Sequence, residues 1–93
     1  MTEIITPKDL GPRVVSLGEL RRVLGPLTEG YTWGEKAIYD LWMMGAPVPG
    51  APGEPARRIL LPTQFLKWYR DVAARMGRDM AQVKADYGKL PKR

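Results

Sequence analysis

Residues 38–71, IYDLWMMGAPVPGAPGEPARRILLPTQFLKWYRD, carry the clearest structural pattern of the sequence. An apolar helical stretch ends at Gly45, and the segment at 46–55 that follows holds four prolines and two glycines. No helix tolerates that density of proline, and a central strand would lose too many hydrogen-bond donors. The segment ARRILL at 56–61 is typical of a strand, and Pro62 is suited to open a helix. The stretch therefore predicts a helix, a loose β-hairpin with a Pro/Gly tip, and another helix.

Upstream, a capping box marks the first helix. Ser16 is followed three residues later by Glu19, so the Ser16 hydroxyl can accept from the Glu19 amide while the carboxylate reaches back to the Ser16 amide. Apolar residues recur at helical spacing over 17–24, and Gly25 with Pro26 stops the helix. The expected core residues are Leu17, Leu20, Val23 and Leu24.

The second helix begins with the same signal. After a loop at 27–31, Thr32 and Glu35 form a capping pattern, and the predicted helix spans about 33–44. Its expected core residues are Ala37, Ile38, Leu41, Trp42 and Met44. The third helix is predicted from Pro62 to Gly77, with Phe65, Leu66, Trp68, Tyr69, Val72 and Met76 on its apolar face.

The remaining segments complete the plan of the chain. Residues 13–15 are predicted as a short strand, and Asp79 with Gln82 indicates a fourth helix of about eight residues that reaches Gly88. We expect an N-terminal arm at 1–12, one domain at 13–77, and a short C-terminal helix with a basic tail at 78–93.

The composition of the chain limits the range of possible functions. The 93 residues carry a net charge of +5 and contain neither cysteine nor histidine. Without cysteine the chain has no thiolate nucleophile and cannot form a zinc ribbon. Without histidine it lacks the commonest metal ligand and the commonest general base. We therefore expect no enzyme, cofactor, metal site or small-molecule substrate. No apolar run is long enough to span a membrane, and a cytoplasmic location is expected. The positive charge favours a polyanionic partner.

The order of elements, with IYDLWMMGAPVP, the Gly-rich tip and RRILLPTQFLKWYRD, resembles the small winged DNA-binding domains of phage excisionases, MerR-type regulators and lambda-type small terminase subunits. The resemblance covers roughly residues 14–76. It implies a mainly α-helical fold with a small β-hairpin, the winged helix-turn-helix, and a double-stranded DNA partner. The chain departs from the family in its long connection at 25–32 and in the proline density of the wing.

In this resemblance the helix at 33–44 enters the major groove, and the wing at 46–61 lies on the backbone or in the minor groove. Lys36 is expected to donate to guanine or phosphate, Tyr39 to phosphate, and Asp40 to accept from cytosine. Gly34 would let the helix start approach a phosphate. The alternative is an ordinary ion pair between Lys36 and Asp40 on a solvated face.

Four arginines are the further DNA-contact candidates. Because side chains alternate along a strand, one of Arg57 and Arg58 is expected to face DNA, the alternative being a charged edge that resists aggregation. Arg21 and Arg22 lie where the first helix would cross the backbone. The aromatic residues Trp42 and Trp68 have core spacing, which favours packing over base stacking.

The C-terminal helix carries an apolar stripe of Val83, Tyr87 and Leu90. This stripe either docks on the core or pairs two copies of the chain, and we expect self-association, since a lone winged domain buries little surface on DNA.

Three functions are compatible with these patterns. The first is a sequence-specific DNA-binding protein of phage or mobile-element type, acting as an excisionase-like recombination factor or a transcriptional regulator. The second is a small terminase subunit that recognises DNA for packaging. The third, from another class, is a small protein-binding module such as an inhibitor of a host enzyme, using the Pro-rich loop with Met43 and Met44.

Overall fold

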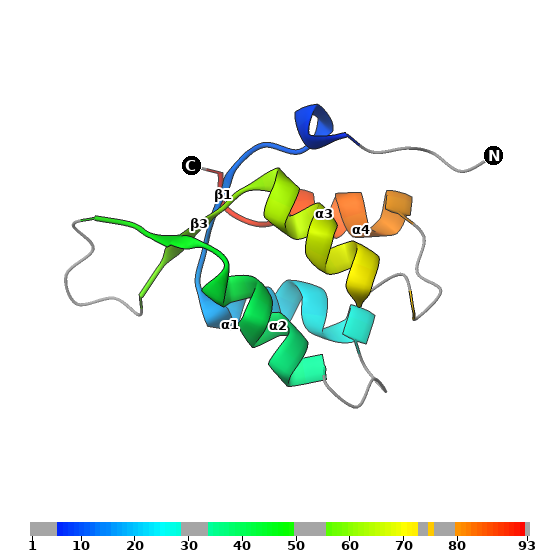
Figure 1. Cartoon of the computed structure of the whole chain (residues 1–93), viewed down its shortest axis with the longest axis horizontal. Coiled ribbons are helices and arrows are strands. Elements are labelled where there is room, and N and C mark those ends of the chain that lie inside the picture. The colour runs from blue at the N-terminus through cyan, green and yellow to red at the C-terminus, as the bar shows by residue number, and fades with distance from the viewer. Residues whose placement is uncertain (1–5, 29–33, 50–55, 73–74, 76–79, 93) are drawn as a thin grey trace.

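The computed structural model describes residues 6–28, 34–49, 56–72, 75 and 80–92. These residues form four α-helices, two short 3-10 helices and a three-stranded antiparallel sheet (Figure 1). The Pro/Gly tip at 50–55, the predicted cap Thr32, Gly77 and Asp79 lie outside the described residues.

The first two helices follow their predictions closely. α1 spans Leu17–Leu24, and the Ser16 hydroxyl accepts from the Glu19 amide at 3.2 Å. A 3-10 helix, η2 at Gly25–Thr28, continues the chain, and α2 spans Gly34–Met43. Proline and glycine after α1 thus tighten the last turn into a 3-10 helix instead of opening a loop at once.

α3 is shorter than predicted. It spans Pro62–Asp71, and Val72 is the C-cap residue, whereas the apolar pattern suggested a helix up to Gly77. The Arg75 amide donates to the Val72 carbonyl, which is a tight turn after the helix. Periodicity shows which side chains face the core, but no residue near position 72 signals where the backbone leaves the helix. α4 spans Met80–Gly88, as expected.

The sheet is built around β3 at Arg58–Leu60, the second strand of the predicted hairpin. This strand pairs with β2 at Ala46–Pro47 on one side and with β1 at Arg13–Val15 on the other. The sequence predicted the hairpin and the first strand but not their pairing. Because β1 immediately precedes α1, this pairing joins the base of the wing to the start of the helical part.

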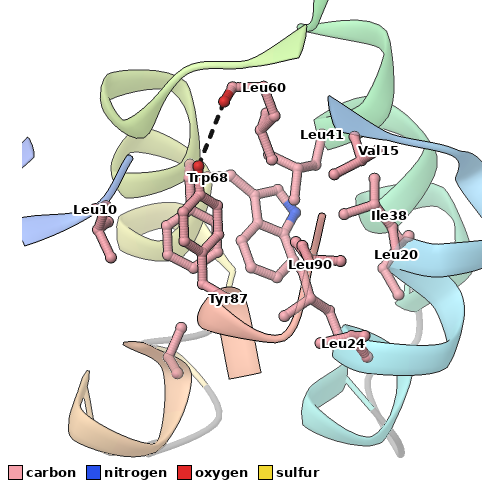
Figure 2. Close-up of a cluster of buried hydrophobic side chains, with 13 residues drawn as sticks. Leu10, Val15, Leu20, Leu24, Ile38, Leu41, Leu60, Trp68, Tyr87 and Leu90 are labelled. Atoms are coloured by element: carbon pink, nitrogen blue, oxygen red, sulfur yellow. Dashed lines mark hydrogen bonds between the residues drawn. The ribbon is translucent and has the colours of Figure 1, made fainter. Parts of the chain in front are cut away.

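One hydrophobic core joins the four α-helices. Trp68 and Tyr87 lie in its centre among leucines from both ends of the chain (Figure 2). Leu10, from the predicted arm, is 2% exposed, and Val83, Tyr87 and Leu90 of the C-terminal stripe are equally buried. The core therefore extends across the predicted boundaries at 12/13 and 77/78.

The position of that stripe corrects one expectation. Val83, Tyr87 and Leu90 pack on the chain's own core, so they do not offer a surface for pairing two copies. Their apolar stripe is explained by folding, because all three side chains are buried in the common core.

Candidate nucleic-acid interface

α2 has one buried and one exposed side. Ala37, Ile38 and Leu41 are buried, and the exposed residues are those the sequence placed outside, namely Glu35, Lys36, Tyr39, Asp40 and Met43. Tyr39 is 44% exposed and Met43 is 46% exposed, although both are large and partly apolar. The exposed side of α2 thus carries donors, acceptors and apolar surface together.

Two hydrogen bonds from α3 hold α2 in place. The Trp68 indole Nε1 donates to the Ala37 carbonyl at 2.8 Å, and the Gln64 Nε2 donates to the Met44 carbonyl at 2.6 Å. Both acceptors are backbone oxygens, so the contacts determine the position of the helix rather than that of a side chain. The exposed side of α2 is therefore presented on a rigid support.

The glycine at position 34 is explained by packing within the chain. A Cβ atom at this position would lie 3.0 Å from the Thr28 carbonyl oxygen and 3.2 Å from the Thr28 hydroxyl oxygen. The side of Gly34 where a Cβ would stand thus faces η2. The start of α2 needs glycine to pack against Thr28, and that contact explains the residue without a phosphate.

Lys36 and Asp40 line a hollow between α2 and α3. Among the described residues no ion pair joins these two side chains, so the solvated ion pair considered above is not formed. The hollow has a volume of about 200 Å³, and its other lining residues are Ala37, Met44, Trp68, Asp71 and Val72. The sequence could not reveal it, because it arises from the packing of two helices.

Arg58 joins β3 to the end of α2. Its Nη1 donates to the Gly45 carbonyl at 3.0 Å, and its guanidinium carbon lies 4.3 Å from the centroid of the Trp42 ring. Cation–π stacking of this kind is strongest for arginine on tryptophan. Trp42 is half-buried: its ring packs against the core, as expected, and also supports Arg58.

Arg57 forms an ion pair with α1. Its Nη2 lies 2.9 Å from the Glu19 Oε1, and both side chains are partly buried. The capping box expected at Ser16 is thus completed by only one of its two bonds, because the Glu19 carboxylate is directed to the wing. Arg57 and Arg58 are thus both engaged within the chain, and the DNA contact expected of one of them stays a prediction.

Arg21 and Arg22 are exposed on α1, where the sequence placed them. Their contact with DNA, like that of Lys36, Tyr39, Asp40, Arg57 and Arg58, remains a prediction.

The described ranges contain no group of three Asp, Glu, His or Cys side chains that could hold a metal ion. Over the same ranges, no helix combines the length and the apolar character that a membrane crossing requires. No family model, curated protein or solved structure matches the chain.

Proposed function

We propose that this chain is a sequence-specific double-stranded DNA-binding protein with a winged helix-turn-helix fold. α2 would lie in the major groove, and the wing at 46–61 would contact the backbone or the minor groove. The observation that carries the proposal is the pair of contacts made by Arg58 with Gly45 and Trp42, which fix the wing to the end of α2. The two elements proposed to contact DNA are therefore held together as one rigid unit.

The exposed side chains divide the work. Lys36 and Asp40 read base edges, while Tyr39 donates to a phosphate. Arg21 and Arg22 add backbone contacts from α1. Arg57 exchanges Glu19 for a phosphate when DNA approaches, since its ion pair is partly open to solvent. A net charge of +5 supports attraction to the duplex.

The resemblance to phage excisionases and MerR-type regulators favours a recombination factor or a transcriptional regulator of a phage or mobile element. A small terminase subunit that marks DNA for packaging is the alternative within the same fold.

The test is a fluorescence anisotropy titration of duplex DNA at several salt concentrations. Affinity should fall steeply with salt, because each neutralised phosphate contributes about 0.9 to the slope of log K against log salt. Replacing Arg21 and Arg22 together with alanine should reduce that slope by about one to two. The matched control replaces Lys67 and Arg70, which are exposed on α3, and should leave the slope unchanged.

A protein-binding module is the second candidate, and a specific observation favours it. The hollow beside Lys36 and Asp40 has an apolar floor, and the exposed Met43 lies on the same helix. Such a surface fits a side chain of a protein partner. Binding to a protein partner that hardly weakens with salt, with no retention of any duplex from a random pool, would establish this function instead.

A further inference from the structure

Arg13 occupies a position where its charge is costly. It lies on the core-facing side of β1, and only 7% of its surface is exposed. Its guanidinium carbon lies 5.1 Å from the centroid of the Tyr87 ring, and Nε and Nη1 are buried without a hydrogen-bond partner. Arginine cannot lose its proton to become neutral in a protein. A buried, unpaired guanidinium therefore calls for an anion.

A cavity of about 580 Å³ lies beside this guanidinium. It is lined by Asp9, Gly11, Pro12, Arg13 and Lys92. The backbone holds Lys92 there, because the Val14 amide donates to the Pro91 carbonyl at 2.9 Å and residues 13 and 92 form a β-bridge. Two cationic side chains from opposite ends of the chain thus meet at one cavity.

Asp9 is the carboxylate among these lining residues, but it is engaged elsewhere. Its Oδ2 accepts from the Thr6 amide at 2.9 Å and from the Thr6 hydroxyl at 3.1 Å, and these bonds lower the pKa of Asp9. Within the described residues no ion pair links it to Arg13. The lining residues therefore retain a net positive charge that includes the unpaired guanidinium.

We propose that this cavity binds a phosphate-sized oxyanion through the Arg13 guanidinium and the Lys92 ammonium group. The planar fork of arginine matches two oxygens of a phosphate, and a second cation suits a ligand with a charge near −2. The 3-10 helix η1 (Pro7–Asp9) and the C-terminal end lie on the side of the molecule opposite α2 (Figure 1). The site thus lies away from α2, and its phosphate binding can be tested independently of the proposed function.

The direct test is an NMR titration of the full ¹⁵N-labelled chain with sodium phosphate, compared with sodium chloride at equal ionic strength. Phosphate should cause saturable shifts of the Gly11 amide and the Arg13 Nε–H signals, and chloride should not. Equal shifts with both salts, or shifts that do not saturate, would overturn the site.

Variants then assign the contacts. Lys92→Ala should weaken phosphate binding about threefold to tenfold, and Arg13→Lys at least about tenfold, because lysine cannot bind two oxygens side by side. The matched control is Lys89→Ala, since Lys89 is equally charged but pairs with Asp86 at 3.2 Å outside the cavity. A loss as large with Lys89→Ala would show that bulk charge, not a site, attracts the anion. Should Arg13→Lys fail to fold, Lys92→Ala still decides, since Lys92 is an exposed residue.

Asp9→Asn should change the phosphate affinity in the opposite direction. Removing a negative charge from the rim should tighten phosphate binding about threefold. Weaker phosphate binding in a variant whose thermal melt matches that of the wild type would show that Asp9 does not repel the anion, and the proposal fails.

A final arm identifies the source of the phosphate group. Lys92→Ala is titrated with a duplex of about 20 base pairs as well as with free phosphate. A parallel loss for both ligands assigns the site to a DNA phosphodiester, and a loss for free phosphate alone assigns it to a small phosphate ligand. The slope measurement on Arg21 and Arg22 tests the proposed function separately, so either idea can fail alone.

Discussion

At the scale of single residues, Tyr87 connects three segments through one hydroxyl group. Its ring packs on Phe65 with 4.4 Å between centroids, and its hydroxyl is shared between the Gly11 carbonyl at 3.0 Å and the Leu60 carbonyl at 3.3 Å. The second of these bonds is drawn in Figure 2. Burial raises the pKa of Tyr87 to about 12, and the positive charge of Arg13 acts in the opposite direction. The native state thus requires the neutral phenol.

This requirement predicts an alkaline loss of stability. The unfolded chain ionises Tyr87 near pH 10, whereas the folded chain does so near pH 12, so the contribution is fully present below pH 10. Between pH 10 and pH 12 about 2–3 kcal/mol should be lost. Urea unfolding at a series of pH values measures it. Tyr87→Phe should be less stable at pH 7 by about 1–2 kcal/mol and should lack this alkaline loss. Tyr39→Phe, which removes an exposed hydroxyl, should keep it; parallel curves for wild type and Tyr87→Phe would refute the assignment.

Gly45 is a second residue whose identity the packing dictates. A Cβ atom there would lie 2.8 Å from the Arg58 Cβ and 3.0 Å from the Ile59 carbonyl oxygen. Neither atom belongs to the mobile end of a side chain, so α2 and β3 would have to separate. Gly45→Ala should therefore cost about 1–3 kcal/mol of unfolding free energy. Gly18→Ala is the control: it lies in α1, a Cβ there meets nothing closer than 4.0 Å, and it should stabilise by about 0.5–1 kcal/mol. Thermal melts of both variants decide; similar melting temperatures would contradict the close approach.

At the scale of elements, local signals predicted the helices well, and long-range contacts were out of reach. Ser16 and the apolar spacing predicted the bounds of α1, because the cap and the side-chain contacts that start a helix are local. The pairing of β1 with β3 joins residues that are far apart in sequence. The sequence of a three-residue strand does not indicate which other strand it pairs with. Leu10 was missed for a similar reason, since one apolar residue has no period.

The candidate site was predictable to the same extent. The exposed side of α2 follows from helical spacing, so Lys36, Tyr39 and Asp40 were placed correctly. The partners of the wing arginines were not predictable, because Glu19 and Trp42 reach them only after α1, α2 and β3 pack together. The burial of Arg13 was predictable in part, because Arg13 lies two residues from Val15 and therefore on the same face of the strand.

Replacing Arg57 and replacing Arg58 should have different effects on stability and on DNA binding. Arg58→Ala removes a hydrogen bond to Gly45 and the stacking on Trp42, and should cost about 1–3 kcal/mol of stability. Arg57→Ala breaks a partly exposed ion pair and should cost about 1 kcal/mol or less, while lowering the salt slope of DNA binding by about one. Urea unfolding and anisotropy on the same preparations give both quantities. Equal stability losses would show that Arg58 does not hold the wing on α2.

At the scale of the whole molecule, one core supports every proposed surface. Leu10 at one end of the chain and Leu90 at the other belong to the same buried cluster as Trp68. With only one core, a variant that disturbs packing would affect every surface at once. Tests of recognition must therefore use exposed side chains, and α2 provides three of them in Lys36, Tyr39 and Asp40.

These three residues decide whether the molecule reads a sequence. If α2 lies in the major groove, Lys36→Ala should relax the preference at one base position by about 1–3 kcal/mol. Tyr39→Phe should have a smaller effect that is uniform across sequences, because a phenol donating to phosphate carries no base information. Selection from a random duplex pool, followed by anisotropy on the selected and a scrambled duplex, measures both. Circular dichroism confirms that each variant is folded.

Asp40→Asn is the most informative change, because it should raise non-specific affinity for DNA and lower sequence discrimination at the same time. Removing a negative charge near the phosphates should raise affinity for the scrambled duplex, since the carboxylate repels the backbone. If Asp40 also accepts from cytosine, the same variant should lose discrimination between the two duplexes. An exposed acid without a role in recognition would raise both affinities equally and leave their ratio unchanged. If all three folded variants bind the selected duplex as the wild type does, α2 does not face DNA. The hollow beside Lys36 and Asp40 would then be the better guide to a partner, and that partner would be a protein.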